Sequence, residues 1–202
     1  MAIHYHDAVD HGLPHDPLKA IVAPRPIGWI STYDDDGTPN LAPYSFFNMV
    51  SDRPKIVMFS SVGWKDSATH AKRRGAFAAN LATGALARQV NETSAPVERG
   101  VSEFERAGLT PVRCQEVDAP MIEGSRAVLE CRVTETMQPR SLDGAASTTV
   151  MVFGQVVGYW IDDELLRDGL FSSARAGLLS RLGYFDYATT DETFSMERPK
   201  GP

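Results

Sequence analysis

The sequence predicts a mainly β, α+β fold, in which a closed or nearly closed antiparallel barrel carries short helical insertions. Stretches rich in β-branched and aromatic residues outnumber the helical patterns along the chain. The helical patterns are short, and they do not alternate regularly with strands as a doubly wound nucleotide-binding fold requires. The 202 residues suit one domain that needs neither a metal nor a disulfide for stability.

The first elements form a predicted hairpin. Residues 26–32 have a strand pattern that ends at Asp34-Asp35-Asp36-Gly37, where glycine permits the positive φ of a hairpin turn. The chain returns through residues 40–44. Residues 55–61 form a further strand, and its apolar run 56–59 is expected to be buried on both faces. The acidic turn superficially suggests calcium, but the later ligands of a calcium loop are missing, so we interpret it as a turn.

A helix follows over residues 67–74. Asp66 or Ser67 can cap its start, and Gly75 can end it. Residues 76–81 then form another predicted strand.

Two more short helices are expected. Leu86 and Val90, four residues apart, mark one of them. Ser102 and Glu105 form a capping box for the next, which Gly108 ends.

Two long strands are predicted over residues 125–136 and 148–161, with a polar loop over 139–147 between them. Cys131 lies on the apolar face of the first of these strands, so we interpret it as a small buried core residue. Neither Cys114 nor Cys131 forms a CxxC or zinc-like spacing.

The domain is predicted to span residues 18–190, between an N-terminal arm (1–17) and a C-terminal tail (191–202). The arm carries His4, His6, His11 and His15. No carboxylate or cysteine pattern completes a metal site there, so a mobile or dimer-covering arm is favoured over a metal centre. The start of the chain has no signal-peptide pattern, and no apolar run is long enough to span a bilayer, so a cytoplasmic location is expected.

The formal charge of −6 argues against nucleic acid or an anionic membrane as the main partner. There is no GxGxxG after a strand, no Walker loop, no HExxH and no GxSxG motif. Hydrolysis by an activated nucleophile therefore has little support. Redox chemistry carried by a bound cofactor needs no acid–base pair, although a non-catalytic barrel would lack one too.

Hydroxyl residues cluster where the first strands end and where the 67–74 helix starts. Such a surface can hold a flat aromatic ring together with an anionic tail. A phosphate would be bound at Ser60, Ser61, Lys65, Ser67 and Thr69; caps and a solvated lysine are the alternative interpretation. A ring and its polyol chain would be bound at Ser31, Thr32, Ala42, Pro43, Tyr44, Ser45 and Asn48.

Three aromatic residues, Trp29, Phe46 and Phe47, could cover the ring, but core packing is the better interpretation for any one of them. Asn80 lies within an apolar strand and needs a hydrogen-bond partner. Contact with a cofactor and a structural hydrogen bond are equally open for it. Arg175, Arg181, Tyr184 and Tyr187 could guard a bound cofactor or contact the phosphate of a second one, with subunit packing favoured.

From Leu18 to Tyr187 the chain resembles the flavin reductase-like family of FMN-binding split barrels. The similarity is carried by the segments Pro24-Arg25-Pro26, Trp29-Ile30-Ser31-Thr32, Gly37 to Ser45, Phe47-Asn48, Lys65-Asp66-Ser67, Glu103-Phe104 and Arg181-Leu182-Gly183-Tyr184. The resemblance implies a split barrel and a homodimer with FMN at or near the subunit interface. It also implies NAD(P)H-dependent flavin reduction, which often supplies a separate monooxygenase.

Three functions remain open under this resemblance. The first is an NAD(P)H:flavin oxidoreductase that passes reduced flavin or electrons onward. The second is an electron-carrier flavoprotein with tightly bound FMN. The third is a flavin-dependent enzyme acting directly on a small organic substrate, with a pocket shaped by the helical insertion over residues 83–108.

Overall fold

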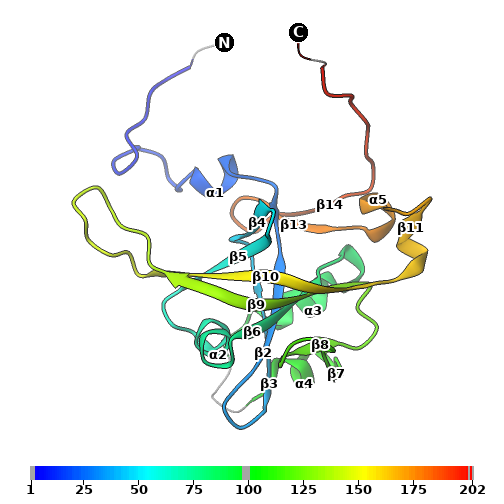
Figure 1. The fold of residues 1–202 in the computed structure, drawn as a ribbon. Helices are drawn as coiled ribbons and strands as arrows, with labels where there is room; N and C mark the ends of the chain where they lie inside the picture. Colours follow the sequence, from blue (N-terminus) through cyan, green and yellow to red (C-terminus); the bar gives the residue numbers. More distant parts are fainter. Residues whose placement is uncertain (1–2, 97–100, 200, 202) are drawn as a thin grey trace.

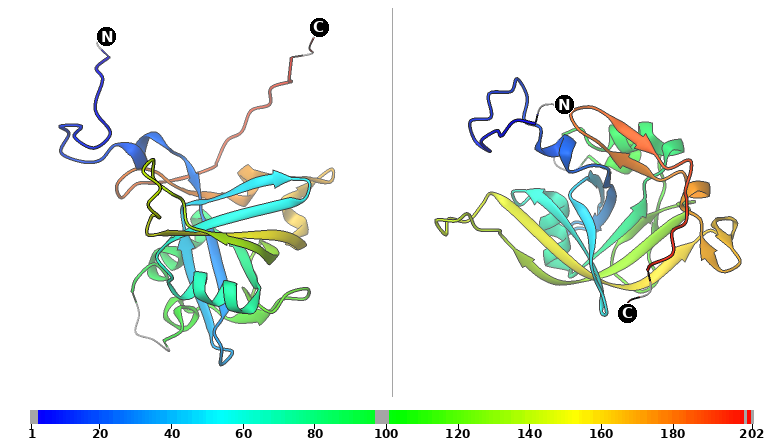
Figure 2. Two further views of the ribbon diagram at one scale, coloured as in Figure 1. Left: turned by 60° about the vertical axis from the view of Figure 1, so that its left-hand side comes forward. Right: turned by 90° about the horizontal axis from the view of Figure 1, so that it is seen from above.

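The central element of the fold is a seven-stranded antiparallel sheet (Figure 1). The computed structural model describes residues 3–96, 101–199 and 201. The strand order is β3–β2–β6–β9–β10–β5–β4, and the sheet curls so that β3 at one edge approaches β5 near the other (Figure 2). The strands are β2 (Gly28–Tyr33), β3 (Pro39–Tyr44), β4 (Phe47–Asp52), β5 (Lys55–Val62), β6 (Ala76–Leu81), β9 (Ala127–Met137) and β10 (Thr149–Ile161). The predicted mainly β fold is therefore confirmed.

Apolar side chains fill the inside of the curled sheet. Ile30, Phe59, Phe77 and Val152 are fully buried there. The rings of Phe59 and Phe77 meet edge to face with centroids 5.2 Å apart, a favourable aromatic geometry. Cys131 lies in this cluster, which confirms its interpretation as a core residue.

Helix α2 (Asp66–Arg74) covers one end of the barrel. Its Ala68 and Ala71 are buried in the core cluster, and Gly75 ends it with a φ of 69° as predicted. The predicted cap is wrong. The residue before the helix is Lys65, and no side chain of the described residues caps the N-terminus. Its first N–H groups therefore keep their capacity to bind an anion.

Three short helical segments make up the insertion after β6. They are η1 (Gly84–Leu86), α3 (Ala87–Glu92) and α4 (Glu103–Ala107), and residues 97–100 of the insertion lie outside the described residues. Gly108 ends α4 as predicted, with a φ of 65°. The predicted capping box is wrong, because the Ser102 hydroxyl donates to the Pro39 carbonyl at 2.9 Å and so ties α4 to β3.

Small sheets and short segments complete the fold. One three-stranded sheet joins residues far apart in sequence and places β13 between β1 and β14. These elements carry few core residues, which explains why the sequence pattern does not reveal them. They are α1 (Leu18–Ile21), β1 (Arg25–Pro26), β7 (Pro111–Arg113), β8 (Pro120–Ile122), η2 (Asp163–Leu165), β11 (Leu166–Arg167), β12 (Leu170–Phe171), α5 (Ser173–Ala176), β13 (Leu179–Arg181) and β14 (Tyr187–Thr189).

Two predictions about the first strands have different outcomes. The turn at residues 34–37 is confirmed: Gly37 has a φ of 85°, and the Asp34 carboxylate accepts from the Thr38 N–H at 2.7 Å. The prediction that residues 56–59 are buried on both faces is wrong. Only the inward side chains Val57 and Phe59 are buried, because the described chain leaves the outer face of β5 partly uncovered.

The two ends of the chain extend away from the barrel (Figure 1). Within the described chain, residues 3–17 and 191–199 form no helix or strand. Among the described helices, none has the length and apolar character needed to span a bilayer.

Candidate functional site

A basic pocket of about 340 Å³ lies where β3 ends and α2 begins. Four cationic side chains from separate parts of the chain surround it: Lys19, Arg25, Lys65 and Arg181. Ser45, Ser60 and Tyr184 add hydroxyl groups. No acidic residue is found among the described residues that line it, so the pocket favours an anion.

The two arginines of the basic pocket are direct cross-strand neighbours, because Arg25 on β1 pairs with Arg181 on β13. Like charges placed opposite each other are unfavourable. Burial lowers the pKa of Arg25, and the positive charge of Arg181 lowers it further. A bound anion would offset this repulsion.

Arg25 is held in place by backbone carbonyls. It is 7% exposed, and it donates to the carbonyl of Lys19, to Val22 at 2.7 Å and to Leu182 at 2.8 Å. Its Nε is buried without a hydrogen-bond partner among the described residues. A buried donor left unpaired is costly, so this atom has capacity for a further acceptor.

A second cavity of about 490 Å³, here called the helix pocket, adjoins the basic pocket and shares Pro43, Tyr44 and Lys65 with it. Ala42 and Ser67 also line the helix pocket. The two cavities therefore form one groove past the end of β3 and the start of α2. The groove has a cationic end in the basic pocket and an uncharged surface at Ala42 and Pro43, which suits a ligand with distinct anionic and flat parts.

Buried hydroxyl groups meet beside this groove. Burial raises the pKa of Tyr44, while the nearby Ser67 and Ser61 hydroxyls act against that rise. The Ser67 hydroxyl accepts a hydrogen bond from the Asn40 amide at 2.9 Å. Ser61 is 1% exposed, and its Oγ makes no hydrogen bond with the described residues.

The helix pocket also contains a carboxyl group. Glu103 is buried at the start of α4, and its Oε2 accepts from the Leu41 N–H at 3.1 Å. Burial raises the pKa of Glu103, the Leu41 hydrogen bond opposes this, and the charge of Asp66 adds to it.

Most of the residues predicted to bind a phosphate and a ring come together in this groove. They are Ala42, Pro43, Tyr44, Ser45, Ser60, Lys65 and Ser67. Asn48 and Phe46 line a neighbouring groove beside α1 that continues from the basic pocket, and Phe46 lines both.

Three other predicted site residues are structural in this fold. Trp29 is fully buried and donates to the Thr93 hydroxyl at 2.8 Å, so its ring is not available to cover a ligand. Ser31 donates to the Pro120 carbonyl at 2.6 Å. Asn80 donates to the Trp29 carbonyl and the Ser31 hydroxyl, and accepts from the Ile122 N–H at 2.8 Å. Its hydrogen bonds are therefore structural.

Two threonines are also placed away from the groove. Thr32 is fully buried next to His70 and accepts from Asn40 at 3.3 Å. Thr69 donates to the carbonyl of Trp64 at 3.1 Å. In both cases the hydroxyl makes a hydrogen bond within the fold, and the predicted ligand contacts stay predictions.

The sequence interpretation missed Lys19 and Arg25 and favoured packing for Arg181. The sequence offered one signal for Arg25: it lies between two prolines, in a segment with no apolar strand pattern, so a packing role does not account for it. The pairing of Arg25 with Arg181 joins positions 156 residues apart, which no local pattern reveals.

Neither a reactive cysteine nor a metal-binding cluster is found among the described residues. Burial raises the pKa of Cys114 to about 12 and also raises that of Cys131, so neither is a reactive thiolate at neutral pH. Within residues 3–96, 101–199 and 201, no group of three or more His, Cys, Asp or Glu side chains could hold a metal ion.

Comparison with solved structures supports the fold. Component B of nitrilotriacetate monooxygenase from Bacillus cereus superposes with a TM-score of 0.82 and is 26% identical, covering 89% of this chain and 90% of that one. A split-barrel protein of Shewanella frigidimarina has a TM-score of 0.80 at 22% identity, covering 90% of each chain. Flavoredoxin of Desulfovibrio vulgaris has a TM-score of 0.78 at 20% identity, covering 87% and 91%. The predicted split barrel is confirmed.

Comparison of sequences identifies the family. An uncharacterized protein of Halalkalibacterium halodurans is 34% identical over 188 residues, which cover 90% of this chain and 89% of that protein. The model of the flavin reductase like domain matches residues 22–186. The chain therefore belongs to the flavin reductase-like family.

Proposed function

We propose that the protein binds FMN and acts as an NAD(P)H:flavin oxidoreductase. The observation that carries this proposal is the basic pocket, where Lys19, Arg25, Lys65 and Arg181 surround a cavity that has no acidic lining residue in the described chain. A dianionic phosphate is the kind of ligand that such a pocket binds best. Family membership supports a flavin as the molecule that carries it.

The phosphate would be held at the start of α2. Lys65 supplies a charge, and the uncapped N–H groups of the helix supply donors. Arg181 and Ser60 face the same cavity. Arg25 Nε and Ser61 Oγ are buried beside the groove and have no hydrogen-bond partner among the described residues, which fits the binding of a ligand there.

The ring would lie along the end of β3. Ala42, Pro43 and Tyr44 line the groove, and Ser45 lies at its continuation toward Phe46. Pro43 pairs with Trp29 on the edge strand β3 and has no N–H of its own, as is typical of a proline at a sheet edge.

FMN, when bound, would accept a hydride from a nicotinamide coenzyme and pass the electrons onward. The protein's part is to hold the phosphate, orient the ring and leave one ring face reachable. No residue of the chain is assigned as a catalytic acid or base.

A homodimer is part of this proposal. The groove beside α1 is lined by apolar side chains that remain exposed in the single chain, among them Leu18 (61%), Ile21 (74%) and Phe46 (43%). Because this groove shares Lys19, Ser45 and Phe46 with the basic pocket, a second copy seated on it would also border the flavin. Sedimentation of the purified protein tests this part independently.

The proposal also includes a partner that accepts electrons from the reduced flavin. One solved structure similar to this chain is a component of a monooxygenase, which supports a monooxygenase or another electron acceptor as the downstream partner. Similarity to a flavoredoxin supports the alternative of an electron carrier with tightly bound FMN.

The test uses the purified full-length protein with added FMN and either NADH or NADPH. The proposal expects FMN-dependent oxidation of at least one coenzyme and turnover of excess free flavin. If FMN stays bound through gel filtration but excess flavin is not turned over, the electron-carrier alternative holds. If FMN does not bind, or neither coenzyme is oxidised above background, the reductase proposal fails.

A further inference from the structure

The end of the barrel that α2 does not cover contains a further cavity of a different kind. α2 lies near the far end of β2, where His70 is 3.5 Å from Thr32. The cavity opens at the other end of the same strand, beside Gly28, and has a volume of about 340 Å³. We call it the aromatic slot, and its main lining residues are Gly28, Phe47, Ala79, Leu81, Tyr159 and Phe171.

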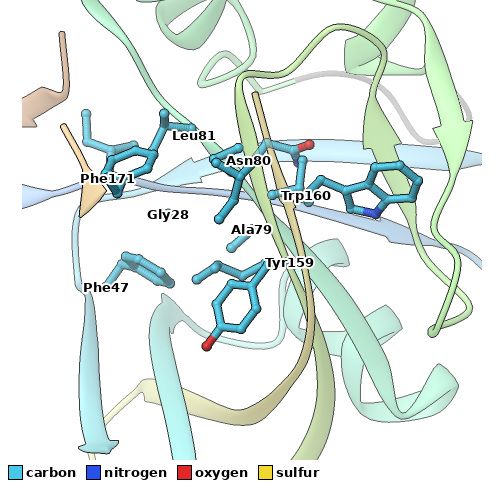
Figure 3. A pocket seen from close by; sticks show the side chains of 13 residues that line it. Gly28, Phe47, Ala79, Asn80, Leu81, Tyr159, Trp160 and Phe171 are labelled. Atoms are coloured by element: carbon cyan, nitrogen blue, oxygen red, sulfur yellow. The ribbon is translucent and has the colours of Figure 1, made fainter. Parts of the chain in front are cut away.

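The slot is recessed because its floor is made of small residues. Gly28 and Ala79 lie at the floor, and Figure 3 shows Phe47 and Phe171 on either side of Gly28. A Cβ at position 28 would lie only 2.5 Å from Phe47 Cδ2, so the Phe47 ring packs directly on the glycine backbone. The result is a hollow between rings rather than a flat apolar surface.

A β-bulge turns Tyr159 toward this hollow. The pairing of β10 with β9 shifts between Val156 and Gly158, so that Tyr159 pairs with Leu129 on the inward face. Without the extra residue, strand alternation would point Trp160 inward instead. Bulges that re-aim a side chain occur often at barrel rims and binding sites.

Two of the polar side chains that line the slot, Trp160 and Asn80, are already hydrogen-bonded within the fold. Trp160 directs its indole N–H to the buried Glu130 carboxylate at 2.6 Å, and in Figure 3 its ring points away from the hollow. The Asn80 amide is used within the core. None of the described residues that line the slot is charged. A charged ligand would therefore lose its hydration without compensation.

We propose that the aromatic slot binds a small, flat, uncharged aromatic molecule. Its volume is at the lower end of the range for ligand pockets and suits one or two fused rings. Barrel mouths are a common place for such sites. None of the six main slot residues lines the basic pocket, so this inference stands independently of flavin binding.

The test compares two ligands that differ by one charge. Calorimetric titration of the full-length protein with 2-naphthol is expected to show saturable binding. Naphthalene-2-sulfonate, which has the same rings and a negative charge, is expected to bind at least about tenfold more weakly. The titrations are run with and without FMN, and the naphthol affinity is expected to be the same in both.

Three variants test whether naphthol binds in the aromatic slot. Phe171→Ala removes one wall and is expected to weaken naphthol binding about tenfold. Ala127→Phe places a ring at the slot rim on the same strand face as Leu129 and is expected to abolish it. Leu170→Ala is the matched control, because Leu170 is 74% exposed beside Phe171 and does not line the slot.

Four outcomes would overturn the proposal. One is absence of naphthol binding, and another is equal affinity for both ligands. A third is unchanged binding by Phe171→Ala and Ala127→Phe when circular dichroism shows both to be folded. The fourth is displacement of naphthol by FMN, which would make the slot part of the flavin site. If Phe171→Ala instead breaks an oligomer of a protein that does not bind naphthol, the slot is a contact between copies.

Discussion

The basic pocket and the aromatic slot are cavities of the same volume, about 340 Å³, with opposite chemistry. The basic pocket gathers four cations from α1, β1, the start of α2 and β13, outside the barrel. The slot is lined by uncharged residues, mostly at the strand ends of the barrel itself. Position in the fold therefore decides which kind of ligand each cavity can accept.

The difference follows from how each cavity is built. The barrel interior must be apolar to pack, so a cavity at its mouth inherits apolar walls. The basic pocket lies where loops and strand ends meet, and there charged groups keep partial access to water. Changes in one cavity should therefore leave ligand binding in the other unchanged, and the following predictions examine that independence.

The largest effect is expected from removing two charges of the basic pocket. The double variant Lys65→Ala/Arg181→Ala loses two charge-assisted contacts to a phosphate. At about 2 kcal/mol each, FMN affinity should fall about 1,000-fold. Fluorescence titration of FMN measures it, and naphthol binding should not change.

Arg175→Ala is the control for that experiment, because Arg175 is an exposed arginine of α5 outside both cavities. An equal loss of FMN affinity in the control and the double variant would contradict a local phosphate site. It would show instead that only the overall charge of the protein matters.

The second-largest effect is expected from removing the Glu130 carboxylate, which holds Trp160 at the slot. The buried Glu130 carboxylate accepts from Trp160 Nε1 at 2.6 Å and from the N–H groups of Gln115, Glu116 and Val117. Glu130→Ala leaves several buried donors unpaired and should lower the free energy of unfolding by about 3 kcal/mol. Urea unfolding measures this.

Glu130→Gln keeps one carbonyl acceptor and should recover part of that stability. Naphthol affinity should fall in Glu130→Ala, because Trp160 loses the contact that orients this end of β10, while FMN affinity should hold. Equal stability of Glu130→Ala and wild type would show that the carboxylate does not anchor residues 115–117.

The sequence predicted the barrel well for physical reasons. Long strands such as 125–136 and 148–161 carry apolar residues at the strand period, and Gly75 and Gly108 end helices because they adopt positive φ. These are local signals. The short sheets were missed because two- and three-residue strands such as β1 and β11 bury too little to leave a pattern.

The candidate site was predicted only in part. Residue types near the end of β3 and the start of α2 were informative, and the Tyr44, Lys65 and Ser67 that they indicated do line the groove. Polar residues inside a strand were not, because the sequence does not tell whether Asn80 or Ser31 meets a ligand or a neighbouring backbone group. The bulge that turns Tyr159 inward depends on pairing with β9 and has no local signal.

Gly28→Ala examines the contact between Gly28 and Phe47 at the floor of the slot. Phe47 lines the slot and also the groove beside α1, and an added Cβ would lie 2.5 Å from its ring. Because the ring must move, stability should fall by about 2 kcal/mol. Thermal unfolding measures the loss, and naphthol affinity should fall more than FMN affinity. Unchanged stability would show that Phe47 has room to shift.

The smallest effect is expected at the acidic side of the helix pocket, from Glu103→Gln. Burial raises the pKa of Glu103 above its value in the unfolded chain. Between those two pKa values the folded protein holds an extra proton, so the stability due to this group falls as pH rises through that interval. Glutamine cannot ionise and still offers an oxygen to the Leu41 N–H.

The variant should therefore match wild type below the unfolded pKa of Glu103 and become more stable relative to it as pH rises toward neutrality. Urea unfolding at several pH values between about 4 and 7 measures the difference in unfolding free energy. Glu105→Gln, an exposed position of the same helix, is the matched control. A difference that stays constant with pH would show that Glu103 does not titrate differently in the folded state. Naphthol binding should be the same in all three proteins, because the carboxyl group lines the helix pocket and not the slot.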